Sequence, residues 1–394
     1  MMNTELLLKL LDIYGSPLYV YDAEHFWQML QRIPQQVGYK PTTYCFAAVT
    51  NGSLALLQLV RRAGWSIHAN TPGDIYLGLK AGFLPEQIVY SGSNLSPADM
   101  QQVLAWGVTT FNLDSVAQVQ QLCELAKDVP CLQLGLRLNH PPLTGDSRIG
   151  VQPHEFPEAV AIARRYNRSI QGLHFYRGTG TNATQAFIAV IDQLLEIGRS
   201  LPDWKYLDFG GGFGYPYRHG KVVFDWQAFG QALSQALNGT GIHLILEPGR
   251  NVIAGCGVLL TTVVSVKYQG EKQIVGVDTT IANLTAPSVY GDYRQIITLN
   301  KNGVTLPTDV CGNTTYSRDY LGRNMALPPL EIGDRLAILD VGAYGYAMAS
   351  HFLHRPKPAE VLVKGEHHFL IREREDYSVL LSNQCNMEQA YALY

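Results

Sequence analysis

The chain has 394 residues, a formal net charge of −3 and a hydrophobic fraction of 46%. This composition excludes a mostly disordered chain, and the near-neutral charge argues against a nucleic-acid platform. No apolar run reaches the roughly 20 residues of a membrane helix, and Met1–Glu5 carries no positive leader segment. We therefore expect a cytoplasmic protein that binds a small molecule. The six cysteines form no CxxC pair, so we expect neither a disulfide framework nor a metal site.

In the first two thirds of the chain, short apolar runs alternate with amphipathic segments. Apolar residues at i, i+3, i+4 and i+7 predict helices over Leu54–Ala63, Val116–Ala126 and Ala186–Ser200. Alternation of strands and helices implies parallel pairing, and about eight such strands suggest a closed (β/α)8 barrel, although a doubly wound open sheet also fits the count. The strand candidates are Tyr44–Val49, Ser66–Ala69, Ile88–Ser91, Thr109–Leu113, Leu132–Leu138, Ile170–Phe175, Lys205–Phe209 and His243–Glu247.

After Arg250 the pattern changes to short β-branched runs separated by Gly, Asn and Pro, without long helical periodicity. This pattern predicts an antiparallel β domain. The strand-like run Tyr14–Tyr21 is expected to join it, which divides the chain into segments 1–30, 31–255 and 256–394. The predicted strands are Val258–Tyr268, Gln273–Val277, Arg294–Leu299, Arg335–Val341 and Glu360–Val363.

In a parallel barrel the functional site lies at the carboxyl ends of the strands. The run Gly210, Gly211 and Gly212 follows one predicted strand. Successive glycine amides can point at one anion, usually a phosphate, although a tight turn without a ligand explains the run equally well. Arg250, after the next strand, favours the phosphate because a guanidinium suits that group.

Glu247 is the second candidate, because it ends the last barrel strand just before Pro248. A buried carboxylate facing a ring nitrogen would keep that nitrogen protonated. The alternative is an ion pair with Arg250 that only shapes the loop. His174 lies on an apolar strand, so we expect a satisfied core histidine. Tyr344 has glycine neighbours, so its ring either faces a ligand or packs in the core.

Several motifs together resemble the fold-type III pyridoxal-phosphate decarboxylases, and most closely the diaminopimelate decarboxylases. They include the opening at 15–22, the glycine run with Phe213 and Gly214, the segment 247–250, and the long C-terminal signature at 340–362. The resemblance spans nearly the whole chain. It implies an alanine-racemase-like (β/α)8 barrel, or TIM barrel, plus a C-terminal antiparallel β domain. It also implies a homodimer in which each site uses residues of both chains.

The first departure from that family concerns its Schiff-base lysine. The matching stretch here runs from Phe46 to Asn51, and Val49 occupies the lysine position. A valine has no amine with which to bind an aldehyde. No other lysine of the predicted barrel is well placed, because each precedes a strand, lies on a helix or lies well past the glycine run; these are Lys40, Lys80, Lys127, Lys205 and Lys221.

Other family positions have also changed. The strand-two aspartate corresponds to His68, and the histidine that stacks on the cofactor ring corresponds to Tyr176, which can still stack. A Cys-Glu pair donated across the dimer corresponds to Thr315 and Tyr316, and a substrate-binding arginine corresponds to Ala286. The resemblance retains a cofactor-binding set, namely Gly210, Gly211, Gly212, Glu247, Gly249, Arg250, Tyr344, Tyr176 and Thr179.

The sequence therefore predicts a decarboxylase-like protein with a retained binding shell for pyridoxal phosphate or another phosphate-bearing ligand. Without the lysine and the cysteine, we expect weak or absent decarboxylation, as in a pseudoenzyme that pairs with itself or with a paralogue. One alternative is altered chemistry on a phosphorylated or amino-acid-derived ligand, using Tyr176, Thr315, Tyr316 and His68. Another is an active amino-acid decarboxylase that holds its cofactor without a covalent bond.

Overall fold

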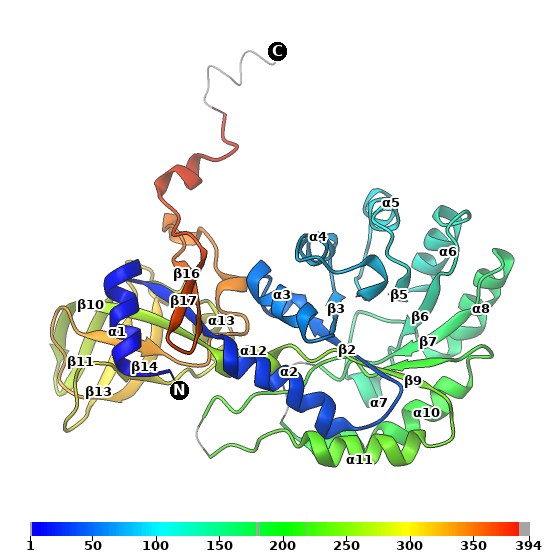
Figure 1. The fold of residues 1–394 in the computed structure, drawn as a ribbon, viewed down its shortest axis with the longest axis horizontal. Helices are drawn as coiled ribbons and strands as arrows, with labels where there is room; N and C mark the ends of the chain where they lie inside the picture. Colours follow the sequence, from blue (N-terminus) through cyan, green and yellow to red (C-terminus); the bar gives the residue numbers. More distant parts are fainter. Residues whose placement is uncertain (1, 179, 181, 219, 386–394) are drawn as a thin grey trace. The chain divides into compact units, whose positions relative to one another are not determined.

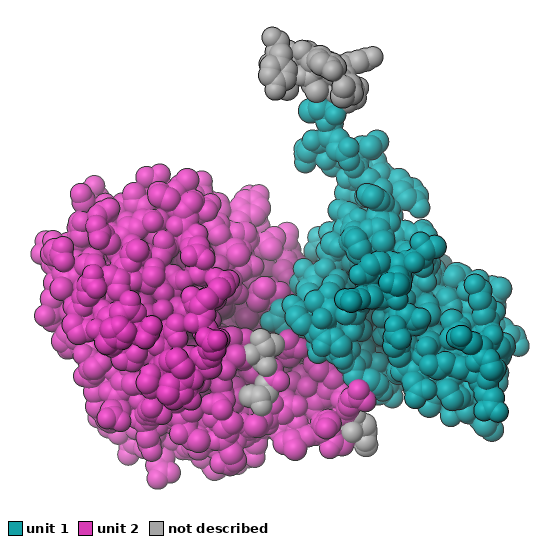
Figure 2. Space-filling model, turned by 180° about the vertical axis from the view of Figure 1, so that it is seen from behind, with its two compact units in different colours: residues 1–24, 255–394 teal, residues 25–254 magenta. Residues whose placement is uncertain are grey.

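The computed structural model describes residues 2–178, 180, 182–218 and 220–385. The chain divides into two compact units, one of residues 25–254 and one of residues 1–24 with 255–394 (Figure 2). Within the described residues, no helix combines the length and the apolar character that crossing a membrane requires.

The first unit is a closed barrel of eight parallel strands surrounded by helices (Figure 1). Its strands are mostly apolar because both faces are covered, as the sequence pattern predicted. The strands are β2 Thr42–Ala47, β3 Ser66–Ala69, β4 Ile88–Tyr90, β5 Thr110–Leu113, β6 Gln133–Arg137, β7 Ile170–His174, β8 Tyr206–Asp208 and β9 His243–Leu246. The predicted barrel is confirmed, and the open sheet is excluded.

Hydroxyl side chains cap the three successive helices that follow strands β3, β4 and β5. Thr71, Ser96 and Ser115 each accept a hydrogen bond from a backbone amide of the first helical turn. These caps satisfy amides that a helix leaves unpaired. The helices are α2 Ala23–Val37, α3 Leu54–Arg62, α4 Pro72–Lys80, α5 Pro97–Ala105, α6 Val116–Leu125, α7 Pro141–Thr144, α8 Phe156–Arg165, α9 Thr184–Ile188, α10 Ile191–Arg199, α11 Trp226–Leu237 and α12 Arg250–Ile253.

The single helix predicted over Ala186–Ser200 is wrong, because the chain forms α9 and α10 with a break between them. Phe187 of α9 is fully buried in an aromatic cluster, where its ring stacks 5.0 Å from Phe213 and 6.2 Å from Phe209. The buried residues of α10 begin again at Ile191. The two segments thus bury separate apolar faces, which the uniform helical periodicity does not distinguish.

The second unit contains a nine-stranded sheet with the order β14-β13-β11-β10-β1-β16-β17, and β12 and β15 pair beside β10. It confirms the predicted β domain, but two of its pairs, β1 with β16 and β11 with β13, are parallel. Parallel neighbours need a long connection, and the entire barrel connects β1 to the rest of this sheet. The strands are β1 Leu18–Asp22, β10 Gly257–Gln269, β11 Lys272–Val277, β12 Ile296–Thr298, β13 Leu306–Cys311, β14 Tyr320–Leu327, β15 Arg335–Ile338, β16 Ala359–Lys364 and β17 His367–Arg372.

Two short helical segments complete this unit, α1 Thr4–Tyr14 and α13 Ala286–Tyr290. The helix α1 is absent from the predicted elements, because the only element expected in this segment is the strand Tyr14–Tyr21. Its residues Leu7, Leu10 and Leu11 share a buried cluster with Val20 of β1.

A buried polar layer crosses the barrel interior. The Tyr206 hydroxyl donates to Asn112 Oδ1 at 3.0 Å, and Asn112 Nδ2 donates to Asp208 Oδ2 at 2.7 Å and to Ser91 Oγ at 3.1 Å. The Tyr206 ring fits because a neighbouring strand carries Gly172, where a Cβ would lie only 1.9 Å from the ring. The polar layer therefore requires a glycine at position 172.

We predict that Gly172→Ala destabilises the protein by about 3 kcal/mol, because the new methyl group overpacks the barrel against Tyr206. Urea unfolding measures this change. Gly73→Ala, in a helix where the nearest atom would lie 3.5 Å away, is the control and should be neutral or slightly stabilising. Equal stability of the two variants would contradict the packing described for Tyr206.

Candidate active site

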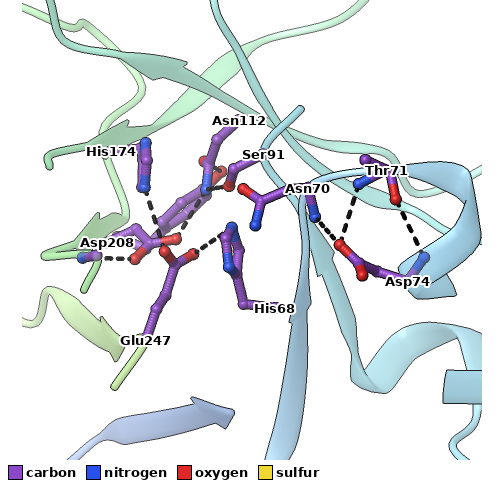
Figure 3. A network of polar contacts seen from close by, with 11 residues as sticks. His68, Asn70, Thr71, Asp74, Ser91, Asn112, His174, Asp208 and Glu247 are labelled. Atoms are coloured by element: carbon purple, nitrogen blue, oxygen red, sulfur yellow. Dashed lines mark hydrogen bonds and ion pairs between the residues drawn. The ribbon is translucent and has the colours of Figure 1, made fainter. Parts of the chain in front are cut away.

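The carboxyl ends of the barrel strands bring four buried ionisable side chains together (Figure 3). His68 comes from β3, His174 from β7, Asp208 from β8 and Glu247 directly follows β9. Glu247 lies between the two imidazoles, with Oε1 3.5 Å from His68 Nε2 and Oε2 3.4 Å from His174 Nε2. Parallel strands that end at one edge explain this convergence of residues distant in sequence.

Burial controls the charge of this cluster. Loss of hydration raises the pKa of Glu247 to about 7 and raises the pKa of Asp208 well above its usual value. The same loss lowers the pKa of His174 to about 4 and lowers that of His68 well below its usual value. Both imidazoles are therefore neutral at pH 7, while the carboxyl groups retain protons more strongly than exposed ones do.

His174 is a core histidine, as predicted, but only one of its ring nitrogens is satisfied. Its Nδ1 atom is buried and has no hydrogen-bond partner among the residues that the structure describes. Both nitrogens of His68 and the Oε1 atom of Glu247 are likewise buried without a hydrogen-bond partner in the described chain. Unpaired buried polar atoms are costly, so their concentration here indicates a site built for a ligand.

Asp208 connects the cluster to the glycine run, a role that the sequence analysis missed. Its Oδ1 accepts a hydrogen bond of 3.0 Å from the Gly210 amide, and its Oδ2 accepts one from Asn112. Glu247 N donates to Gly210 O at 2.8 Å. One carboxylate thus fixes the start of the glycine run beside the cluster.

Packing between strand ends explains why the glycine run tolerates no side chain. Gly210 and Gly212 have φ of +66° and +90°. A Cβ would lie 2.1 Å from Phe175 O at Gly210, and 2.8 Å from Glu247 O at Gly211. Within the described chain, the amides of Gly211 and Gly212 donate no hydrogen bond to a protein group. The turn is therefore tightly packed and still offers two adjacent donors to an anion.

Arg250 and Gly249 follow Glu247 at the start of α12. The Arg250 Nη1 atom donates to the Tyr217 hydroxyl at 3.3 Å, so Tyr217 belongs to this part of the site although the sequence analysis did not select it. A Cβ on Gly180 would lie 3.6 Å from Arg250 Nε. At Gly249 a Cβ would lie 2.5 Å from Thr50 Cγ2. This glycine therefore allows the segment after β9 to pack closely against the segment after β2.

Val49 lies just beyond β2, in a short 3-10 turn over Ala48–Thr50, and its side chain is 42% exposed. An exposed valine makes little contribution to the core. The neighbouring Thr50 is buried, and its hydroxyl donates to Ala47 O at 2.7 Å. The turn therefore directs position 49, and not position 50, away from the packed interior.

Tyr176 follows β7, and the Arg137 guanidinium lies 5.3 Å from the centre of its ring. Arg137 comes from β6, and burial lowers its pKa while Glu247 opposes that effect. The ring and the guanidinium thus form a cation–π pair beside the cluster.

The remaining predicted site residues lie elsewhere. Thr315 and Tyr316 are exposed on the loop between β13 and β14 of the second unit. Tyr344 is in a turn after β15, with a left-handed φ of +58°. Ala286 begins α13 and is buried. Thr179 lies outside the described residues.

A metal ion is the other ligand that this chemistry allows. Donor atoms of His174, Asp208 and Glu247 lie within 4.8 Å of one another. Asp208, however, already uses both oxygens for Asn112 and Gly210. Two adjacent free amides and a buried acid suit an organic ligand that has a phosphate at one end and a polar ring atom at the other.

Comparison with known proteins identifies the family of this chain. Residues 24–254 match the family described as "Pyridoxal-dependent decarboxylase, pyridoxal binding domain", and the chain belongs to that family. It is a fold-type III pyridoxal-phosphate decarboxylase homologue most similar to the diaminopimelate decarboxylases.

One such relative, the diaminopimelate decarboxylase of Methanothermobacter thermautotrophicus, is 32% identical over 405 residues, which cover 96% of this chain and 93% of the relative. The diaminopimelate decarboxylase of Vibrio cholerae is 31% identical over 95% of this chain and 94% of its own length. A crystal structure of the Helicobacter pylori diaminopimelate decarboxylase complexed with L-lysine has a TM-score of 0.88 at 27% identity, covering 95% of this chain and 98% of that one.

We predict that the Glu247→Gln variant becomes more stable relative to wild type as the pH increases. Both proteins are compared without bound ligand. The folded pKa of Glu247, about 7, exceeds its ordinary value of 4.5, so ionisation between these pH values opposes folding. The stability difference should therefore grow in favour of glutamine by about 3 kcal/mol over that interval. Histidine contributions are present in both proteins and cancel.

Urea unfolding at successive pH values measures this difference. Glu158→Gln, at an exposed position of α8, is the matched control for loss of a carboxylate. A constant difference between Glu247→Gln and wild type from pH 4.5 to 7 would show that burial does not raise this pKa.

Proposed function

We propose that this chain binds pyridoxal phosphate non-covalently in the barrel and is a weak or inactive decarboxylase. The observation that carries the proposal is Val49, an exposed aliphatic side chain at the strand end where the family resemblance places the lysine. The family depends on pyridoxal phosphate, which when bound supplies the electron sink that amino-acid decarboxylation requires.

The residues of the barrel fit this cofactor. The buried Oε1 atom of Glu247, which is 3% exposed and has no hydrogen-bond partner in the described chain, could accept the proton of a pyridine nitrogen. The free amides of Gly211 and Gly212 could hold a phosphate, and the guanidinium of Arg250 lies on the adjoining strand end. Tyr176 could stack on the ring.

Glu247 would hold a proton at the ring nitrogen only when its own carboxyl group is ionised. Burial opposes that ionisation, and the positive charge of Arg137 favours it. A protonated ring nitrogen adds a second favourable charge. Binding of the ring should therefore transfer the proton of the Glu247 carboxyl group to the ring nitrogen at neutral pH. Arg137 acts as a positioning residue, because its positive charge stabilises the resulting carboxylate.

The other lysines of the barrel unit support the absence of a replacement amine. Lys80 is in the last turn of α4, with its Nζ 5.3 Å from the Tyr76 ring centre. Lys127 follows α6, with its Nζ 6.0 Å from the Tyr166 ring centre. Lys40 and Lys205 precede strands β2 and β8, at the opposite end from Glu247. Lys221 is exposed beyond the glycine run.

We also propose a cytoplasmic homodimer in which the loop carrying Thr315 and Tyr316 completes the barrel site of the other chain. The exposure of Thr315 and Tyr316 supports this assignment, because a loop in the core of its own unit could not be donated. The phenol and hydroxyl groups are weaker acids than a thiol, which supports reduced proton transfer at this position.

We predict that the purified protein binds added pyridoxal phosphate but that borohydride fixes none of it to the chain. Without an amine at position 49, no covalent bond forms for the reagent to reduce. Mass spectrometry of the intact chain and of its peptides measures attachment, and the diaminopimelate decarboxylase of Methanothermobacter thermautotrophicus is the positive control. Attachment to any lysine within residues 25–254 would refute the proposal.

We further predict that Val49→Lys restores borohydride attachment at residue 49 but not full activity. Decarboxylation of meso-diaminopimelate should remain at least about 100-fold below that of the same relative, because the proton donor is missing at Thr315. Val223→Lys, at another exposed valine of the barrel unit, is the matched control and should trap no cofactor. Near-normal turnover by Val49→Lys would contradict the role assigned to the other substitutions. Turnover of a different amino acid by wild type would favour altered chemistry.

A further inference from the structure

The segment after strand β2 lies beside the strand end that carries Glu247. Strand β2 pairs with β9 on one side and with β3 on the other. A Cβ on Gly249 would lie 2.9 Å from Ala47 Cβ and 2.5 Å from Thr50 Cγ2. The segment that includes Val49 therefore packs against the segment that begins with Glu247, and both belong to the carboxyl end of the barrel.

The segment after β2 has no side chain that would favour one ligand substituent over another. The side chains of Ala47, Ala48 and Val49 contain only carbon and hydrogen, and the Thr50 hydroxyl already donates to Ala47 O at 2.7 Å. No Asp, Glu, Lys, Arg or His lies between residues 41 and 60. An aldehyde therefore finds no amine in this segment with which to react, and a charged substituent finds no side chain of opposite charge.

A polar side chain on the neighbouring strand can adapt to different substituents. His68 of β3 is paired in register with Ala47, and burial lowers the pKa of its imidazole, which is therefore neutral at pH 7. Both ring nitrogens are buried without a hydrogen-bond partner in the described chain. A neutral imidazole has one donor and one acceptor, and a change of tautomer exchanges them. His68 can therefore donate to the oxygen of an aldehyde, or accept from a hydroxyl or an ammonium group.

The groups proposed above to hold the ligand recognise its other parts. Glu247 would bind the ring nitrogen, and the amides of Gly211 and Gly212 together with Arg250 would bind the phosphate. In a pyridine ring the substituent at carbon 4 lies opposite the nitrogen, and the family resemblance places that substituent beside position 49. Because Val49 is 42% exposed, a charged group there could keep part of its hydration. These polar contacts would therefore be the same for an aldehyde, a hydroxymethyl or an aminomethyl group at carbon 4.

We propose that the barrel binds phosphorylated pyridines equally well with an aldehyde, a hydroxymethyl or an aminomethyl group at ring carbon 4. This inference rests on the proposed function and defines its ligand class, which includes an alcohol and an amine in addition to the aldehyde. A lysine at position 49 would favour the aldehyde through a covalent bond, and Val49 removes that preference. Because no bond to the chain has to be broken, each ligand leaves the barrel unchanged.

Equilibrium dialysis with pyridoxine phosphate, in competition with pyridoxal phosphate and with pyridoxamine phosphate, tests the proposal. Competition reports only the shared site, so reaction of the aldehyde with exposed lysines does not count as binding. The three dissociation constants of the wild-type protein should agree within about tenfold. Glu247→Gln should weaken all three probes by a similar factor of about tenfold, because each probe carries the same ring nitrogen.

The Val49→Lys variant should create the preference that the wild-type protein lacks. Its lysine amine can condense with the aldehyde, with loss of water, but it cannot do so with the alcohol or the amine. Pyridoxal phosphate should then bind at least about 100-fold more tightly than pyridoxine phosphate. Val223→Lys, at an exposed valine elsewhere in the barrel unit, is the matched control and should keep the wild-type pattern.

Three results would overturn this inference. A difference of more than about tenfold between any two probes in the wild-type protein would show that the barrel distinguishes the substituents. If pyridoxal phosphate is the tighter probe in that case, non-covalent binding of the cofactor as proposed above still stands. Absence of binding by all three probes would overturn both proposals. Unequal losses among the probes in Glu247→Gln, in protein that circular dichroism shows to be folded, would contradict a shared set of contacts.

Discussion

Glu247 has almost no contact with water, and this burial governs the barrel site. Removing a carboxyl group from water raises its pKa, and the two imidazoles beside it lose their tendency to become charged for the same reason. Asp208 adds a second buried acid whose oxygens are already committed to Asn112 and Gly210. The cluster therefore contains several buried polar atoms that have no hydrogen-bond partner in the described chain. A cationic ring nitrogen would give one of them, the Oε1 atom of Glu247, a hydrogen-bond donor.

The barrel was predictable from two patterns. Its strands are short apolar runs because both of their faces are buried, and its helices are amphipathic because only one of their faces is buried. The strand Ser66–Ala69 matches the prediction at both ends. The helical periodicity over Ala186–Ser200 did not predict the break between α9 and α10. The apolar spacing is the same in both helices, although they pack in different places. Strands β13, β14 and β17 were missed because they lie toward or at the edge of the sheet, where exposed polar residues interrupt the apolar pattern.

The candidate site was predictable where a residue type is chemically unusual. Three glycines after a strand, and a glutamate before a proline, are conspicuous in the sequence and converge in the barrel. His174, Asp208 and Tyr217 had no comparable signal, because a histidine, an aspartate or a tyrosine on an apolar strand or in a loop is ordinary. Their importance comes from distances across the barrel, which only the closed fold establishes.

The groups that we propose as phosphate donors in the glycine turn are main-chain amides. Replacing side chains elsewhere in the barrel cannot remove the amides of Gly211 and Gly212, and replacing the glycines themselves would drive new atoms into neighbouring carbonyl groups. Mutation therefore erases reactive side chains far more readily than it erases this backbone turn. A lineage in which selection on catalysis relaxes will lose nucleophiles and proton donors first, while its capacity to hold a phosphate persists for as long as the barrel folds.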